Sequence, residues 1–166
     1  MKANDIEQSP FNSSLESGVR SVILLNALFP LSVDLHRLVD FDYMVVHSGD
    51  VNGPESLHAP LPMRAGELLI RRGIIEKGLL LMLSRGLLDR VPTESGIEYI
   101  ASEKTNSFVC NLETPYLAEL KSRAEWVAEQ FSRLSDNELK GIVKGFFNKW
   151  TTQFQPIDTI LGGRDE

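Results

Sequence analysis

The residues best suited to chemistry lie in one short segment near the middle of the chain. His47-Ser48-Gly49-Asp50 combines an imidazole, a hydroxyl and a carboxylate, with further metal-type ligands at Asp40, Asp42 and His58. A zinc site needs three or four such groups to converge, and a serine nucleophile needs a base that a third group holds in place. The spacing matches neither arrangement, and the chain has no glycine-rich phosphate-binding loop. We therefore expect no enzymatic activity, no metal and no cofactor. Asp50 and Ser48 are expected to cap turns, and His47 is expected to bond a backbone carbonyl inside the loop.

The first half of the chain is predicted to form two helices and a long loop that carries this segment. Ser13 and Glu16 have the spacing of a capping box, which satisfies free backbone N–H groups at a helix start; Pro30 ends that helix. Ser32 is a suitable N-cap for a second helix over residues 33 to 47. Residues 48 to 63 contain two glycines and three prolines, which predicts a long surface loop of the kind that often carries function.

The next segment is predicted to be a helix-turn-helix. A short helix over 67 to 72 is followed by a turn at Gly73 and a second helix over 75 to 85. Gly86 has the position of a glycine that terminates a helix. Five consecutive apolar residues occupy the centre of the second helix, so we expect it to be buried on both sides.

A small β-hairpin is predicted to follow as a wing. Residues 87 to 91 and 97 to 100 favour short strands, with turn residues between them. The two predicted helices, the glycine and the hairpin together indicate a winged helix-turn-helix. Reading DNA bases requires polar side chains on the recognition helix, and the apolar second helix offers only Lys77 and Arg85. Contact with protein is therefore favoured over contact with DNA.

The last third of the chain is predicted to be a helical hairpin. Apolar residues step by three and four along one seam, as expected for lengthwise helix packing: Leu117, Leu120, Ala124, Val127, Phe131 and Leu134. Ser135 and Glu138 form a second capping-box pair, and the short link predicts antiparallel packing. The fold class is thus mainly α. The expected divisions are a flexible tail over 1–12, a winged-helix domain over 13–110 with the long 48–63 loop, a helical hairpin over 111–154 and a tail over 155–166.

Composition narrows the function classes further. The net charge is -6, which argues against nucleic-acid binding by the whole surface, although residues 64 to 90 carry six basic and three acidic residues. No apolar run is long enough for a membrane span, and no secretory signal opens the sequence, so we expect a cytoplasmic protein. The single cysteine, Cys110, follows an apolar pair and is expected to be a buried structural thiol.

Several blocks of sequence together resemble the middle component of ABC three-component conflict systems, a group that includes the Lamassu anti-phage systems. The blocks, which span about residues 10 to 150, are Pro10-Phe11-Asn12-Ser13 with Glu16 and Gly18, Asp42-Tyr43, His47-Ser48-Gly49-Asp50, Gly53-Pro54, Ser56-Leu57-His58, Arg64, Gly66-Glu67-Leu68-Leu69, Arg71-Arg72, Gly78-Leu79 and Ser84-Arg85-Gly86-Leu87. The set is specific as a whole, and no block is specific alone.

This resemblance implies a small accessory subunit of a bacterial defence complex. Its partners would be an SMC-like ABC ATPase and an effector, often a nuclease, which the subunit bridges; DNA would be reached through the complex, and no small-molecule substrate or membrane is implied. The alternative hypothesis is a MarR-like winged-helix transcriptional regulator, which the apolar recognition helix disfavours.

The long loop carries many of the residues that create the resemblance, and loops of this kind lie on surfaces. We therefore predict one partner-binding surface, formed by His47, Asp50, His58, Arg64, Glu67 and Arg71.

Overall fold

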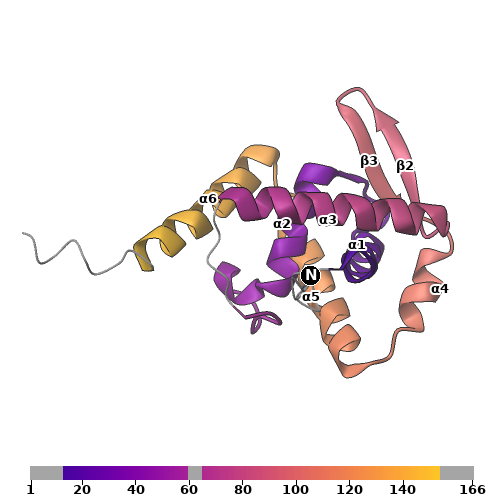
Figure 1. Cartoon of the computed structure of the whole chain (residues 1–166), viewed down its shortest axis with the longest axis horizontal. Helices are drawn as coiled ribbons and strands as arrows, with labels where there is room; N and C mark the ends of the chain where they lie inside the picture. The colour runs from indigo at the N-terminus through magenta and orange to yellow at the C-terminus, as the bar shows by residue number, and fades with distance from the viewer. Residues whose placement is uncertain (1–12, 60–64, 154–166) are drawn as a thin grey trace, which may run out of the picture.

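A long helix crosses the front of the molecule, and a β-hairpin projects from the end of that helix (Figure 1). This computed structural model describes residues 13–59 and 65–153 of the chain. The elements, in order, are α1 (Ser14–Leu28), β1 (Val33–Asp34), α2 (Leu35–Val46), the 3-10 helix η1 (Ser48–Val51), α3 (Ala65–Ser84), β2 (Leu88–Thr93), β3 (Gly96–Ala101), α4 (Thr105–Cys110), α5 (Pro115–Phe131) and α6 (Asp136–Gln153). The fold is mainly helical, as predicted, and the predicted hairpin is part of a three-stranded antiparallel sheet.

The first helix begins where its capping residues predict. The Ser13 hydroxyl accepts a hydrogen bond from the backbone N–H of Glu16 at 3.2 Å. The second helix begins later than predicted, because Asp34 and not Ser32 is its N-cap and accepts from the N–H of Arg37. Val33 and Asp34 are extended and pair with Tyr99 and Glu98 of β3. Ser32 is used in the same sheet contact, since its hydroxyl donates to the Glu98 carboxylate.

α3 is one continuous helix of 20 residues, so the predicted turn at Gly73 is wrong. One interior glycine costs only about 1 kcal/mol relative to alanine, and the packing of α3 against α1 offsets that cost. The predicted stop is confirmed: Gly86 has a φ of 70°, and the N–H of Leu87 bonds the carbonyl of Met82 at 3.1 Å. The hairpin is confirmed as well, with Thr93 opposite Gly96 and strand order β1-β3-β2.

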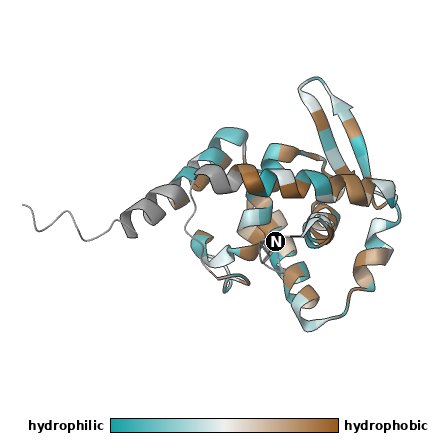
Figure 2. Ribbon diagram, viewed as in Figure 1, coloured by the Kyte–Doolittle hydropathy of each residue, from teal (hydrophilic) through white to brown (hydrophobic). Residues whose placement is uncertain are grey.

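α3 is not buried on both sides, contrary to the prediction from its apolar centre. Ile75, Leu79 and Met82 are buried, and this helix packs chiefly against α1. Leu80 and the more N-terminal Leu69 are exposed. Hydrophobic and hydrophilic residues alternate along the α3 ribbon (Figure 2). The apolar run therefore supplies both a core contact and an exposed apolar surface.

The apolar seam of α5 is confirmed, but its packing partners differ from the prediction. Leu120, Ala124, Val127 and Phe131 are buried, and α5 packs against α1 and α2. Within the described residues, α6 contacts η1 and the ring of Tyr43 and does not pack lengthwise along α5. The two helices therefore do not form the expected antiparallel hairpin.

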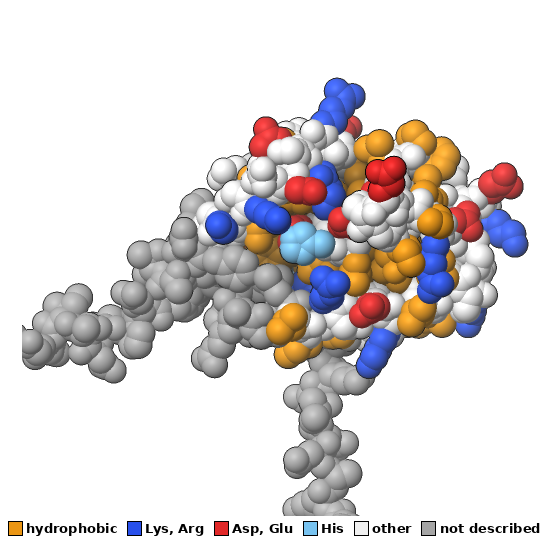
Figure 3. Space-filling view, turned by 90° about the horizontal axis from the view of Figure 1, so that it is seen from above, with side chains coloured by type: hydrophobic (Ala, Val, Ile, Leu, Met, Phe, Trp, Pro, Cys, Tyr) orange, Lys and Arg blue, Asp and Glu red, His pale blue; other side chains and the backbone are white. Residues whose placement is uncertain are grey.

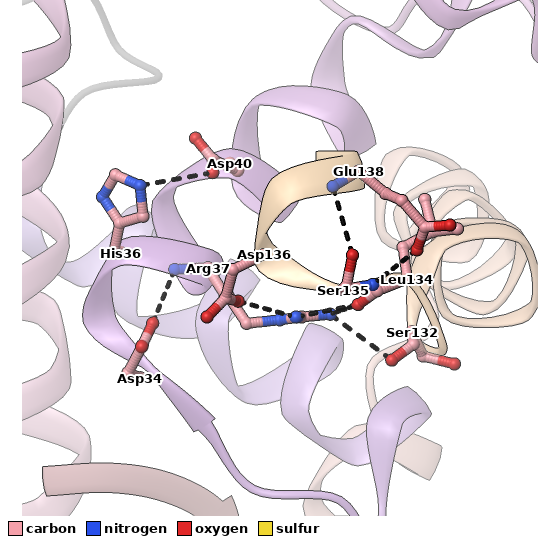
Figure 4. A network of polar contacts seen from close by, with 9 residues as sticks. All are labelled: Asp34, His36, Arg37, Asp40, Ser132, Leu134, Ser135, Asp136 and Glu138. Carbon is pink, nitrogen blue, oxygen red and sulfur yellow. Dashed lines mark hydrogen bonds and ion pairs between the residues drawn. The ribbon is translucent and has the colours of Figure 1, made fainter. Parts of the chain in front are cut away.

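Arg37 of α2 explains why the chain turns away after α5. Its guanidinium donates to the carbonyl of Leu134 at 2.9 Å and to that of Ser132 at 3.4 Å, and it pairs with Asp136 at 3.0 Å (Figure 4). These bonds hold the link between α5 and α6 against α2. The predicted capping box then starts α6, because Ser135 and Glu138 bond each other reciprocally.

Two further predictions concern the single cysteine and membrane-spanning helices. Cys110 is exposed and free, so the buried thiol predicted for it is wrong; its neighbour Val109 takes the buried position at the end of α4. No helix in the described part of the chain is long and apolar enough to cross a membrane.

Glycines allow α1 and α3 to approach closely. A Cβ atom at Gly78 would lie 2.6 Å from the backbone nitrogen of Gly18 and 2.8 Å from the carbonyl oxygen of Ser14. Backbone atoms cannot move aside as a flexible side chain can. At Gly73, by contrast, a Cβ would meet nothing within 4 Å.

The two glycines of α3 should therefore respond in opposite ways to alanine. Gly78→Ala is expected to destabilise the fold by about 1–3 kcal/mol through overpacking. Gly73→Ala should stabilise it by up to about 1 kcal/mol, because alanine favours the helix and finds open space. Urea unfolding of both variants measures the difference, and equal effects would contradict the close contact between α1 and α3.

Candidate functional site: a buried polar cluster

One carboxylate joins the first three long helices inside the molecule. Asp42 of α2 is 1% exposed and receives two hydrogen bonds from Arg20 of α1, at 2.9 Å from Nε and 3.3 Å from Nη2. Arg71 of α3 donates from Nη1 to the same carboxylate at 2.5 Å. Arg20 is itself buried. A charge out of water is tolerated only when it is paired and hydrogen-bonded, so each of these residues depends on the others.

Aromatic and imidazole rings extend this cluster toward the loop. The Arg71 guanidinium lies over the ring of Tyr43, and the Tyr43 hydroxyl donates to Asp50 at 2.7 Å. His47 packs its ring against Tyr43 at 4.7 Å and against His58 at 6.2 Å. His58 in turn shares a hydrogen bond of 2.7 Å between its Nε2 and the hydroxyl of Tyr116 on α5. The polar cluster, as we call these residues together with Arg20 and Asp42, thus connects α1, α2, α3, the loop and α5.

Burial and charge set the protonation of the polar cluster. Burial alone would raise the pKa of Asp42, but the charges and hydrogen bonds of Arg20 and Arg71 outweigh it and lower that pKa. Burial, followed by the charge of Arg71, lowers the pKa of His47 to about 4. Burial, followed by the charge of Arg20, lowers the pKa of His58 to about 4. At neutral pH, therefore, Asp42 is ionised and both imidazoles are neutral.

The loop after α2 is folded tightly by its own polar groups. The Ser48 hydroxyl donates to the carbonyl of Pro54 at 2.8 Å, and the Ser56 hydroxyl accepts from the N–H of Gly49 at 3.0 Å. Arg123 of α5 donates to the carbonyl of Glu55 at 3.0 and 3.1 Å. Ser48 therefore bonds a later part of the loop, whereas the 3-10 helix η1 that begins at this residue has no side-chain cap.

A glycine in this loop also fits against a large side chain of α5. A Cβ at Gly53 would overlap the ring of Trp126. The described part of the loop, residues 48–59, therefore packs against α5, whereas the sequence predicted a surface loop.

The structure brings four of the six predicted partner-binding residues together, but not as an open surface. His47 is 2% exposed, the Arg71 side chain is 15% exposed, and Asp50 and His58 are partly buried. Arg64 and the side chain of Glu67 lie outside the described residues. Long-range bonds from α1, α3 and α5 account for the difference, because they draw these polar groups inward.

Sequence reasoning missed Arg20 and Tyr116 as members of the polar cluster. A signal for Arg20 was present: it is the one charged residue between positions 17 and 25, where small and apolar residues otherwise predominate. A lone charge inside an apolar helix indicates a buried partner. Tyr116 has no comparable local signal. Nowhere in residues 13–59 and 65–153 do three or more His, Cys, Asp or Glu side chains form a group that could hold a metal ion.

The fold should be sensitive to Arg71 and insensitive to its neighbour. Arg71→Glu places a second carboxylate beside Asp42 and removes one of its two partners, which is expected to destabilise the protein by about 3–5 kcal/mol. Arg72→Glu changes the same charge at an exposed position and should shift stability by about 0.5 kcal/mol or less. Urea unfolding compares the two; similar losses would contradict the internal role of Arg71.

Acid should weaken the fold through His47 and His58, whose pKa values are lowered in the folded protein. The unfolded chain binds protons at a histidine pKa near 6.5, whereas the folded pKa values of His47 and His58 are about 4. Stability from these groups is therefore present above pH 6.5 and is lost as pH falls toward 4. Asp40 acts in the opposite sense, because burial raises its pKa from 3.8 to about 6 and the folded state takes up its proton first.

The two effects can be separated by substitution. His58→Gln should make the acid loss of stability shallower, and Asp40→Asn should make it steeper, because it removes the opposing proton uptake. The measurement is the urea midpoint between pH 7 and pH 4.5. Unchanged slopes in both variants would show that these groups do not govern the acid response.

Most of the chain matches one known protein family. Residues 10–153 match the family model described as ABC-three component (ABC-3C) system Middle Component 2. No curated protein and no solved structure matches the chain. The match covers all of the polar cluster and every described helix and strand. The chain therefore belongs to the family of ABC-three component system middle component 2 proteins.

Proposed function

We propose that this chain is a non-catalytic accessory subunit that bridges an SMC-like ABC ATPase and an effector, often a nuclease, in a Lamassu-type anti-phage defence complex of bacteria. The observation that carries the proposal is the family match, because a middle component of a three-component system implies protein partners. Catalysis would then reside in the partners.

The chemistry of the described residues supports a binding role. The most reactive side-chain types, at Asp42, His47 and His58, are occupied in holding helices and loop together. Exposed apolar side chains are distributed over the surface instead, including Leu69, Ile70 and Leu80 on α3 and Ile97 on the hairpin. Hydrophobic patches lie among Lys and Arg on the face seen in Figure 3. Exposed apolar patches of this kind mark protein contacts.

We further propose that residues 13–110 form a winged helix used for contact with protein. The order α1-β1-α2-α3-β2-β3, with a hairpin following the longest helix of this unit, supports that assignment. A hairpin that binds DNA would need a basic surface. Residues 88–101 carry one basic residue, Arg90, against Asp89, Glu94 and Glu98. The MarR-like alternative is disfavoured by this charge, and DNA contact is assigned to the assembled complex.

The predicted partner-binding residues divide into two groups under this proposal. His47, Asp50, His58 and Arg71 would act indirectly, by holding the loop and the start of α3 in place. Arg64 and Glu67, which adjoin Arg71 in sequence, remain our candidates for direct contact with the ATPase or effector.

Co-expression with the ABC ATPase and the effector of the same system tests the proposal. Affinity capture of the tagged chain, followed by size-exclusion chromatography with light scattering, should yield one complex that contains all three proteins. Elution of the tagged chain alone would contradict the bridging role. A mobility-shift assay of the isolated chain on its own upstream DNA should show no specific binding at about 150 mM salt, where specific repressors still bind.

A further inference from the structure

An exposed aromatic side chain separates two hollows on the body. Phe29 follows the end of α1 and is 59% exposed. On one side it lines a hollow of about 670 Å³, between the end of α1 and α5. On the other side it lines a hollow of about 520 Å³, beside β3 and α4. We call the two hollows and Phe29 together the Phe29 groove.

The floor of the Phe29 groove is apolar. Leu28 and Ala128 are buried at its base, and Leu31 is 46% exposed at its edge. An aromatic ring that stands in water beside such a floor has apolar area available for a partner. Aromatic residues in such settings commonly supply the largest share of binding energy in protein interfaces.

The rim of the Phe29 groove is acidic. Glu125 and Glu129 lie one turn apart on α5 and are both exposed, and Asp89 and Glu103 line the second hollow. Arg133 is the one basic residue among the lining residues of the two hollows. The ion pairs found in the described part of the chain include neither Glu125 nor Glu129. The rim is thus available to positive charge from outside.

Charge decides between the possible occupants. Residues 1–12 carry Lys2 against Asp5 and Glu7, for a net charge of -1, and residues 154–166 carry Arg164 against three acids, for a net charge of -2. A second copy of the chain has a net charge of -6, and DNA is more negative still. An acidic rim disfavours DNA and both tails, and it disfavours a second copy through that copy's net charge, although residues 64–90 of the copy are net basic. A basic segment with apolar side chains complements both the floor and the rim.

We propose that the Phe29 groove binds an amphipathic segment of a partner subunit, which places apolar side chains against Phe29 and Leu31 and Lys or Arg beside Glu125 and Glu129. This inference rests on the proposed function, because it assigns one of the two contacts that a bridging subunit needs. Such a contact orients the partner and accelerates its association as well as adding affinity.

Charge reversal at the rim tests the proposal. Glu125→Lys with Glu129→Lys should reduce affinity for one partner, measured by titration of the separately purified ATPase or effector, about tenfold at low salt. The matched control is Glu113→Lys with Glu119→Lys, which reverses two exposed charges outside the groove near the start of α5 and should change affinity less than twofold. Phe29→Ser should lower the affinity for the same partner. The thermal midpoint of unfolding should stay within a few degrees in every variant, because all of the substituted side chains are exposed.

The outcomes separate this inference from the function on which it rests. Failure of the unsubstituted chain to bind either partner would contradict the bridging function itself. Binding of both partners at full affinity by the rim and Phe29 variants would overturn the groove assignment alone. A dimer of the unsubstituted chain that these variants dissolve would assign the groove to a second copy. Such a dimer would overturn the proposal.

Discussion

The fold depends on the carboxylate of Asp42, which pairs with Arg20 and Arg71 inside the protein. The three residues come from α1, α2 and α3, so these two ion pairs link the helices to one another. α1 and α3 also approach closely at Gly18 and Gly78. The buried Asp42 carboxylate cannot be solvated by water, so its two arginine partners must stay in place.

The loop and the C-terminal helices follow from this arrangement. The loop leaves the end of α2 at His47, whose ring packs on Tyr43 within the polar cluster. Bonds from Tyr116 and Arg123 then attach α5 to the loop at His58 and Glu55. Arg37 of α2 sets the direction in which α6 leaves. Among the residues of the family pattern, Asp42, Ser48, His58 and Arg71 therefore serve to assemble the body.

Features that depend on neighbouring residues could be predicted from the sequence. The two capping boxes at Ser13 and Ser135, the stop at Gly86 and the hairpin turn all involve atoms only a few residues apart. The family was recognised for a related reason: many short blocks keep their order and spacing over the matched region.

Features that depend on distant residues could not be predicted. Arg71 and Asp42 are 29 residues apart, and His58 and Tyr116 are 58 apart. The direction of α6 depends on Arg37, which lies about 97 residues before the carbonyl that it binds. Local propensity also misplaced the turn at Gly73, because packing against α1 keeps α3 continuous. The Phe29 groove could not be predicted either, because residues of α1, β3, α4 and α5 that are distant in sequence form it jointly.

We infer that the polar cluster holds the fold and that a partner contacts surfaces such as the Phe29 groove. Amide hydrogen exchange of the full chain, alone and in the assembled complex, tests it most directly. We expect the amides of residues 47–58 to be protected from exchange in the isolated chain, and we expect their exchange rates to change little on assembly. The amides of residues 27–31 and 125–133 should exchange more slowly in the complex than in the isolated chain. Loop amides that exchange freely in the isolated chain and become protected only in the complex would contradict it.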